Sequence, residues 1–406
     1  MSKFIAVVTA LTILAAGLSG CGATEPSGRP YDADKIDAAI IARTNDFSFD
    51  LLREINETDS NGNLFLSPLS ISTALTMTYN GAKGNTMADM ERGLRYQGFS
   101  KENVNETYQN LIPYLLQVDK EVDLTISNSI WYRMGEAIQE AFIETNKQVF
   151  DAEVRELDFS DPASADSINQ WIDDATKGKI DRMIEPPIPA TVVMYLINAV
   201  YFKGDWTTPF DKDSTQEADF TNIAGAVQRT DMMGHYGDVD YGQGDGYKAV
   251  RLPYGKEKVS MYLLLPTDGK TINDWVADLN ADVFADIRSS ITTQEKVDLR
   301  IPKFKMEYDI KELNNELISM GMVLPFDPAA DFSGIREGLF ISQVLHKAVI
   351  EVNEEGSEAA GVTVVVMEES AALEPLTFIA DQPFLFLIAE EGTGSILFLG
   401  KFTSAE

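Results

Sequence analysis

The chain has 406 residues, 44% of them hydrophobic, and a formal net charge of −31 at pH 7. This length allows one to three domains, and because no charge block, proline-rich linker or internal repeat divides the chain, we expect one large domain. Its hydrophobic share is sufficient for a core, and its single cysteine excludes an internal disulfide. The negative charge argues against nucleic acid as a partner, since nucleic acid requires basic patches, and is explained most simply by solubility.

The first residues have the composition of an export signal. Lys3 precedes the apolar run FIAVVTALTILAAGL, which leads into Leu18-Ser19-Gly20-Cys21. This tetrapeptide resembles the lipobox of bacterial lipoproteins, in which the cysteine becomes the lipidated N-terminus. A plain secretory signal or a membrane anchor is the alternative. We expect a signal peptide over residues 1–20, lipidation at Cys21 and a flexible tether over residues 21–35.

This arrangement predicts an exported protein. The lipid would hold it at the cell surface or in the periplasm, and release to the extracellular space is also open. The lipid would be its only contact with a membrane.

Predicted helices dominate the first half of the chain. Apolar residues at helical spacing predict a helix over residues 35–56. Ser67-Pro68 predicts the capped start of another helix, with Gly81 as its C-cap. Further helices are predicted over residues 101–118 and 164–180, separated by a strand over residues 122–132.

Predicted strands dominate the second half. Residues 191–202, TVVMYLINAVYF, are apolar on both alternating faces, which indicates a central strand covered on both sides. Further strands are predicted over residues 258–266, 296–304, 345–353, 383–389 and 395–402. Helices followed by strands indicate an α+β fold.

The sequence contains no catalytic constellation. His235 and His346 are the two histidines, no Gly-x-Ser-x-Gly motif occurs, and Cys21 lies in the signal region. Two distant histidines offer no metal-ligand spacing, and GQGDGY (residues 242–247) lacks the spacing of a nucleotide-binding loop. The protein is therefore not expected to be an enzyme, nor to hold a metal or cofactor.

Four motifs, in order along the chain, resemble the serpins, a family of serine protease inhibitors. They are FLSPLSISTALTMTYNGAKGNT, NAVYFKGDW, HKAVIEVNEEGSEAAG and FIADQPFLFLI. The resemblance covers residues 36–402 and implies one serpin domain over residues 36–406, with three β-sheets, eight or nine helices and an exposed reactive-centre loop. Together with the lipobox it suggests a lipoprotein serpin of the bacterial or archaeal type.

The resemblance implies suicide inhibition of a protease by a monomer. The protease cleaves the loop and becomes esterified to it, and the loop then enters the large sheet as a new strand. Serine proteases are the expected targets. Papain-like cysteine proteases, or a non-inhibitory role as a surface binding protein, are the alternatives.

Serpin motifs also assign individual residues. Ser67, Ser70, Asn198 and His346 correspond to a buried polar cluster beneath the strands that must part. Lys203 and Trp206 correspond to the place where the loop first enters the sheet. Without the resemblance, Ser67 is an ordinary helix cap, His346 an ordinary buried histidine and Trp206 an ordinary core residue.

The hinge of the loop carries the strongest functional signal. It consists of Glu354, Glu355, Gly356, Ser357, Glu358, Ala359, Ala360 and Gly361. Side chains alternate between the two faces of a strand, and the set that starts at Ser357 and runs to Met367 contains no charged residue and no proline. Glu358 lies on the other face, where solvent can reach it. Val362, where inhibitory serpins usually have alanine, also belongs to that outer set.

The resemblance also implies where the reactive bond lies, because inhibitory serpins usually place it at a near-fixed distance beyond the hinge. Counting from Gly356 places cleavage between Ser370 and Ala371, whereas counting back from Pro383 indicates Ala372. A small residue at the bond suits elastase-like or subtilisin-like proteases, whose primary pockets are shallow and apolar. Glu369 is the rival position and would indicate a Glu-specific protease.

Overall fold

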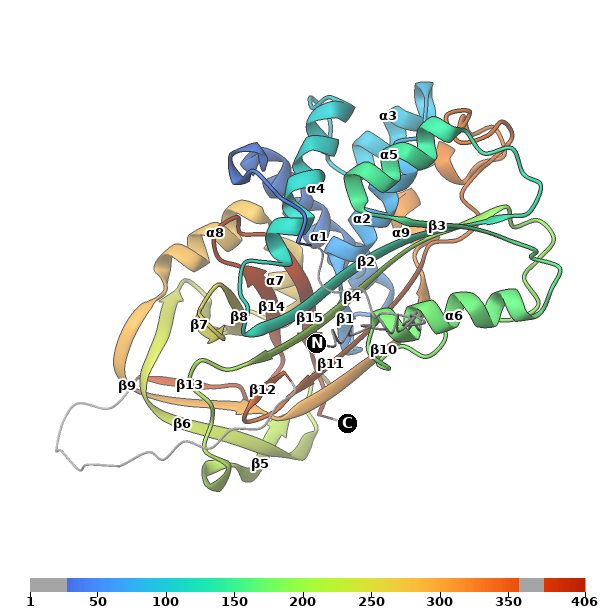
Figure 1. Cartoon of the computed structure of the whole chain (residues 1–406). Helices are drawn as coiled ribbons and strands as arrows, with labels where there is room; N and C mark the ends of the chain where they lie inside the picture. Colours follow the sequence, from blue (N-terminus) through green and yellow to red (C-terminus); the bar gives the residue numbers. More distant parts are fainter. Residues whose placement is uncertain (1–27, 358–375, 406) are drawn as a thin grey trace, which may run out of the picture.

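A computed structural model describes residues 28–357 and 376–405 (Figure 1). Within these ranges the α-helices are α1 (Ala38–Thr58), α2 (Pro68–Tyr79), α3 (Gly84–Gly93), α4 (Lys101–Leu115), α5 (Glu140–Phe150), α6 (Ala163–Ala175), α7 (Ile272–Asp278), α8 (Ala281–Ser290) and α9 (Asn314–Ser319). The first strands are β1 (Leu64–Leu66), β2 (Val122–Arg133), β3 (Glu153–Leu157), β4 (Met194–Asp205), β5 (Gln216–Thr221), β6 (Val227–Gly244), β7 (Tyr247–Tyr254) and β8 (Val259–Pro266). The remaining strands are β9 (Thr292–Pro302), β10 (Phe304–Glu312), β11 (Leu345–Val352), β12 (Gly356–Ser357), β13 (Thr377–Ile379), β14 (Phe384–Glu390) and β15 (Ile396–Phe402).

These strands form three hydrogen-bonded sheets. The largest has the order β1-β15-β14-β8-β7-β6-β9-β13, with β5 paired to β6. A four-stranded sheet has the order β12-β4-β2-β3, and β10 pairs with β11 in the third. Three sheets and nine α-helices among the described residues confirm the predicted α+β fold.

The two smaller sheets are separated by a cavity that residues of both β4 and β11 line. Figure 1 shows β2 and β4 as long neighbouring strands, with β10 and β11 below them and α6 at the right. α2 packs against both β4 and β15. The cavity therefore lies between α6 on one side and α2 on the other.

Local chemistry explains the central elements. The Ser67 side chain caps α2 and Pro68 opens it, as predicted, and nearly every residue of α2 is buried because the helix lies between sheets. All seven residues of β14 and of β15 are buried, and apart from Glu390 and Lys401 their sequences are apolar or glycine. A second apolar cluster, which includes Trp131 and Ile172, fixes α6 to the four-stranded sheet.

Three predicted helix ends were wrong. α6 ends at Ala175 rather than near residue 180. The fourth helix ends at Leu115 rather than near residue 118. α2 ends at Tyr79 with Asn80 as its C-cap, so Gly81 is not the cap. Gly81 instead permits a close approach, because a Cβ atom there would lie 2.0 Å from Cγ1 of Ile335.

The described chain begins inside the segment predicted as a tether. There the backbone N–H of Asp32 donates to Asn110 of α4 (2.9 Å), and Arg29 pairs with Asp151 just after α5 (3.4 Å). Residues 28–35 thus contact the folded domain, and the prediction of a flexible tether stands for residues 21–27, which are outside the described ranges. Among the described helices, none combines the length and the apolar character that a membrane span requires.

Candidate functional site

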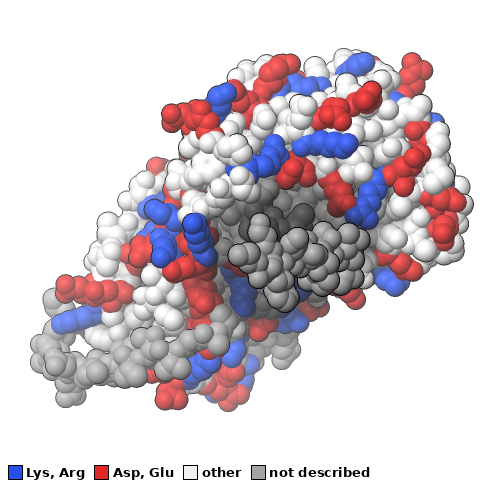
Figure 2. All heavy atoms as spheres, viewed as in Figure 1, with Lys and Arg blue, Asp and Glu red and all other residues white. Residues whose placement is uncertain are grey.

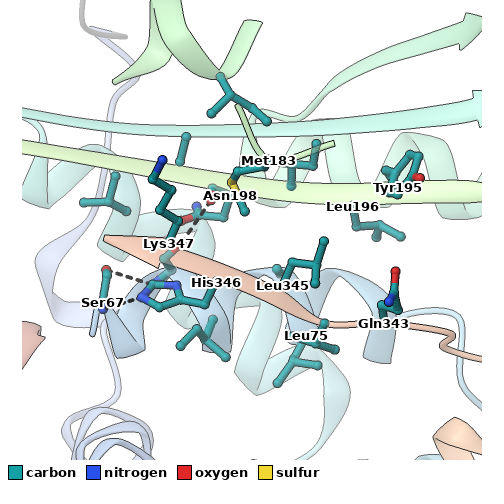
Figure 3. A pocket seen from close by; sticks show the side chains of 18 of the residues that line it. Ser67, Leu75, Met183, Tyr195, Leu196, Asn198, Gln343, Leu345, His346 and Lys347 are labelled. Atoms are coloured by element: carbon teal, nitrogen blue, oxygen red, sulfur yellow. Dashed lines mark hydrogen bonds between the residues drawn. The ribbon is translucent and has the colours of Figure 1, made fainter. Parts of the chain in front are cut away.

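The candidate site is the slot between β4 and β11. Over the described residues these two strands belong to different sheets and share no ladder. A cavity of about 470 Å³ occupies the slot, with walls from β4 and β11 and with side chains of α2 and α6 on its two sides. Figure 3 shows this cavity with Asn198 on one wall and His346 and Lys347 on the other.

The hinge occupies one end of the slot. Gly356 and Ser357 form β12, which pairs antiparallel with Asp205 and Gly204 of β4. On the other side, Asn353 and Gly356 exchange backbone hydrogen bonds, which closes a tight hairpin between β11 and β12. The first two residues of a strand between β4 and β11 are therefore already in place.

Only glycine fits the first of these positions. Gly356 has a φ of +149°, and a Cβ atom there would lie 2.2 Å from the carbonyl oxygen of Gly204 and 2.7 Å from Cα of Asp205. Both neighbours are backbone atoms, which cannot rotate away. The glycine predicted in the hinge is thus required by the close approach of β12 to β4.

Ser357 of β12 points into the protein. It is 4% exposed, and its Oγ lies 3.0 Å from the buried hydroxyl of Tyr254. Burial raises the pKa of Tyr254 and keeps its hydroxyl protonated. The burial of Ser357 agrees with the predicted alternation, in which its set of residues faces the core.

The predicted loop-entry residues lie beside this strand. Trp206 donates from its backbone N–H to Glu355 (2.8 Å) and from its indole Nε1 to Asn353 (2.9 Å). Its ring stacks on Tyr254 with centroids 4.4 Å apart. Lys203 is half-buried on β4, two residues before the end of that strand.

Ion pairs hold the two glutamates of the hairpin. Glu354 is 5% exposed and accepts from Thr215 (2.9 Å) and pairs with Lys303 (3.1 Å). Burial alone would raise the pKa of Glu354, but its hydrogen bonds and Lys303 outweigh burial, and the pKa is lowered. Glu355 pairs with Lys212 at 2.5 Å.

The predicted polar cluster lies at mid-height of the slot. His346 of β11 accepts at Nε2 from the backbone N–H of Ser67 (3.1 Å), as drawn in Figure 3. Ser70 Oγ donates to the backbone carbonyl of Asn198 on β4 (3.0 Å). The start of α2 thus bonds to both walls.

Burial determines the charge of the histidine in this cluster. It lowers the pKa of His346 to about 4, so the ring is neutral near pH 7. Because Nε2 accepts a hydrogen bond, the ring proton resides on Nδ1.

Asn198 is incompletely bonded. Its amide Nδ2 donates to Oδ1 of Asn128 (2.7 Å), and Asn128 in turn donates to the carbonyl of Phe150 (2.7 Å). A carbonyl only accepts, so this chain fixes the orientation of both amides. It leaves Oδ1 of Asn198 buried without a partner among the described residues.

Part of the prediction lies outside the described residues. This applies to Cys21, to the hinge residues Glu358, Ala359, Ala360 and Gly361, and to the reactive-bond candidates Glu369, Ser370, Ala371 and Ala372. Sequence reasoning also missed the residues that hold the hinge: Gly204, Thr215, Lys212, Tyr254 and Lys303. A glycine inside a predicted strand, as at Gly204, is a known signal of close backbone approach.

Charged side chains give this face no single sign. Figure 2 shows Asp and Glu scattered over both halves of the molecule, with Lys and Arg among them. Over the described residues no group of three or more His, Cys, Asp and Glu side chains could hold a metal ion. Neither the charge of this face nor a metal site distinguishes the described part of the molecule. Its distinctive feature is the slot with the hinge at one end.

Known proteins share this architecture. The family model "Serpin (serine protease inhibitor)" matches residues 42–405. A serpin-like protein of Methanosarcina acetivorans is 34% identical over 381 residues, which cover 91% of this chain and 89% of that protein. Intracellular coagulation inhibitor 2 of Tachypleus tridentatus is 34% identical over 379 residues, which cover 91% of this chain and 92% of that protein.

Solved structures agree. The native state of tengpin, a thermophilic serpin, is similar with a TM-score of 0.81 at 32% identity, covering 93% of this chain and 96% of that chain. Thyroxine-binding globulin in complex with thyroxine has a TM-score of 0.80 at 29% identity, covering 90% of this chain and 99% of that chain. From its fold, its motifs and these relatives, the chain belongs to the serpin family.

Proposed function

We propose that the protein is an exported suicide inhibitor of endopeptidases, with serine proteases as its main targets. The observation that carries this proposal is the slot with the hinge seated at its end. A chain segment that follows Ser357 can continue the β12 ladder along β4 without any change of register. An inhibitor that traps proteases by strand insertion requires such a vacancy.

The chemistry of trapping uses the protease's own nucleophile. Its serine hydroxyl attacks the carbonyl of Ser370, the bond to Ala371 breaks, and the proton passes to the new amino terminus of Ala371. The protease is then joined to Ser370 by an ester. If residues 358–367 enter the slot before water reaches the ester, the protease is displaced and remains attached.

The register of β12 predicts where each inserted residue lies. Continuing the ladder pairs Glu358 with Lys203, Ala359 with Phe202, and Met367 with Met194. Glu358 then meets an opposite charge. The backbone groups that β4 and β11 present to the slot gain ladder partners, so insertion is favourable.

Side-chain faces support the same mechanism. Phe202 packs on Phe398 and Tyr254, so its face of β4 points into the core. Ala359, opposite Phe202, shares the face of the buried Ser357. A small residue at this position enters without a clash.

The expected targets follow from the loop tip. Ser370 and Ala371 are small, which suits elastase-like or subtilisin-like proteases, and Glu369 would suit a Glu-specific protease. No arginine or lysine occurs in residues 354–376, so trypsin-like targets are not expected.

One experiment tests the inhibitory function. The purified protein is mixed with elastase-like, subtilisin-like, Glu-specific and papain-like proteases and run on denaturing gels with intact-mass analysis. We expect a covalent complex with a serine protease and a released C-terminal peptide whose mass locates the bond. Cleavage without a complex across the whole panel would contradict inhibition and support a binding role. A complex with papain-like enzymes alone would favour the cysteine-protease alternative.

Export and lipidation form a second part of the proposal. The support is the position of the only cysteine, Cys21, directly after Leu-Ser-Gly at the end of an apolar run. Expression in a bacterial host with a labelled fatty acid is expected to give a labelled membrane-bound protein. Cys21→Ser should abolish the label, and a label that survives this change would contradict lipidation at Cys21.

A further inference from the structure

The cavity between β4 and β11 has the size and the lining of a small-molecule site. Its volume of about 470 Å³ lies within the range of about 300–1,000 Å³ that is usual for ligand pockets. Most of the residues that line it are apolar. On the α6 side it is lined by four isoleucines of the apolar cluster that holds α6: Ile172, Ile180, Ile184 and Ile197. A ligand with an apolar body can bury that body against these side chains.

The charged residues that line this cavity do not follow the charge of the molecule as a whole. They are two lysines and one glutamate, Lys179, Lys347 and Glu351, whereas the chain carries a formal net charge of −31. Glu351 lies opposite Lys305 of β10 in the ladder, and this lysine offsets its charge. The cavity therefore favours an anionic ligand over a cationic one.

Lys347 supplies a cation for such a ligand. It alternates with the buried His346 along β11, and Figure 3 shows the two side chains leaving the strand on different sides. The Lys347 side chain is 17% exposed, and its only ion pair within the described ranges is with Asp181 at 3.6 Å, whose side chain is 84% exposed. Glu307 of β10 also faces it, but that carboxylate is held by Lys305 at 2.6 Å. The largely buried ammonium of Lys347 thus has no strong carboxylate partner, because an exposed pair contributes little.

The cavity is accessible from the end remote from the hinge. Residues 191–194, where β4 begins, and residues 338–344 line this end. Among them Phe340 is 46% exposed, although the cavity that it lines is mostly apolar. A large aromatic side chain partly in solvent at the edge of an apolar cavity marks an entrance for an apolar ligand rather than a sealed void.

We propose that the intact protein binds a small amphipathic carboxylic acid of the class of medium-chain fatty acids in this cavity. The carboxylate of the ligand accepts hydrogen bonds from Nζ of Lys347, and its apolar chain lies against the isoleucines of the α6 side. This carboxylate takes the place of Asp181 and forms a stronger bond, because it lies in the cavity rather than in solvent. The proposal concerns a binding activity of the intact molecule and does not depend on the inhibition of proteases.

Calorimetric titration of the intact protein with decanoate tests the class of ligand. The neutral 1-decanol and the cationic decylamine have the same chain and differ only in the head group. We expect decanoate to bind roughly tenfold more tightly than 1-decanol, because a charge-assisted hydrogen bond is added to the same apolar contact. Decylamine should bind more weakly than either. Decanoate should also raise the melting temperature of the intact form, since it binds the folded state.

Two variants test the role of Lys347. Lys347→Met keeps much of the apolar length of the side chain and removes its charge. It should weaken the binding of decanoate roughly tenfold and leave that of 1-decanol within about twofold of the wild type, which distinguishes a lost charge from altered packing. Lys147→Met is the matched control, because it removes an exposed lysine that pairs with Glu144 on α5. This control should bind decanoate as the wild type does.

Photolabelling locates the site. Decanoate that carries a diazirine at the end of its chain is cross-linked to the intact protein, and the labelled peptides are identified by mass spectrometry. We expect labels within residues 172–184 or on the strands β4 and β11, and unlabelled decanoate should compete with them.

Three results would overturn the inference: equal affinities for decanoate and 1-decanol, unchanged binding of decanoate by Lys347→Met, or labels confined to other parts of the molecule. None of these measurements uses a protease. Absence of a covalent complex with every protease would instead contradict the proposed function, and the decanoate measurements would still decide whether the cavity binds a carboxylic acid.

Discussion

Gly356→Ala is the most direct test of the seated hinge. The added Cβ would lie 2.2 Å from the Gly204 carbonyl oxygen and 2.7 Å from Cα of Asp205. Neither backbone atom can move without disturbing β4, so we expect β12 to leave the ladder. The protein then loses two ladder pairs and the hydrogen bond between Ser357 and Tyr254.

The expected loss follows from these contacts. At about 1 kcal/mol net for each hydrogen bond, β12 contributes about 2–4 kcal/mol to the free energy of unfolding. With an unfolding entropy of about 2.1 cal/mol/K per residue, a domain of roughly 370 residues loses about 3–5 °C in melting temperature.

A matched control separates the clash from backbone strain. Gly98 also has a positive φ, +92°, but no atom lies within 4 Å of a Cβ built there. Gly98→Ala therefore carries the strain of an L-residue alone. We expect Gly356→Ala to melt about 3–5 °C below Gly98→Ala when both are measured by calorimetry.

Tryptophan fluorescence provides a second signal. Trp206 bonds to Asn353 and Glu355 of the hairpin and stacks on Tyr254, so release of the hinge should change its emission. The same measurement in a Trp206→Phe background identifies the part of the emission that comes from Trp206. If Gly356→Ala and Gly98→Ala melt at the same temperature and the emission of Trp206 is unchanged, the hinge is not held in the ladder.

The remaining predictions concern insertion and pH. Ala359→Arg should turn the inhibitor into a substrate, because a charge would enter the core side of the sheet. Glu358→Arg, on the outer face, is the control and should still form complexes on denaturing gels. Unchanged complex formation by Ala359→Arg would contradict the assigned faces. Burial lowers the pKa of His346 to about 4, below the value of about 6.5 in the unfolded chain. Its contribution to stability is therefore full above pH 6.5 and is lost as pH falls from there toward 4. NMR titration, with His235→Asn for assignment, should find the ring neutral at pH 5.5, and a pKa near 6.5 would refute its burial. The pKa of Glu354 is lowered from 4.5 in the folded protein. Its contribution to stability is therefore present above pH 4.5 and disappears as pH falls through its folded-state pKa. Glu354→Gln should flatten this part of the curve of stability against pH in calorimetry, and an identical curve would show that the ion pair does not contribute.

Fold and site were predictable to different extents. The α+β class, predicted from apolar periodicity and long apolar runs, is confirmed, because these patterns depend on neighbours in sequence. The three sheets were implied only by the resemblance to the serpins, and they are also confirmed. Helix ends were less predictable. Gly81 has the residue type of a C-cap, yet its lack of a side chain serves the approach of Ile335, which local sequence does not reveal.

Sequence by itself determined the alternation of the hinge. The alternating set that begins at Ser357 contains no charged residue and no proline, which strand geometry requires of a buried face and which the residue types alone show. The residues proposed for the polar cluster were available only through family resemblance, because nothing local links Ser67 to His346.

Tertiary structure alone decided how the hinge is held. Tyr254 is 103 residues from Ser357, and Thr215 is 139 residues from Glu354, so no periodicity or spacing connects these pairs. The vacancy between β4 and β11 is likewise a property of two strands far apart in the chain that share no ladder. The pattern of side chains along a segment predicts whether that segment is a helix or a strand. Which residue a side chain contacts on a distant element depends on how the whole chain packs.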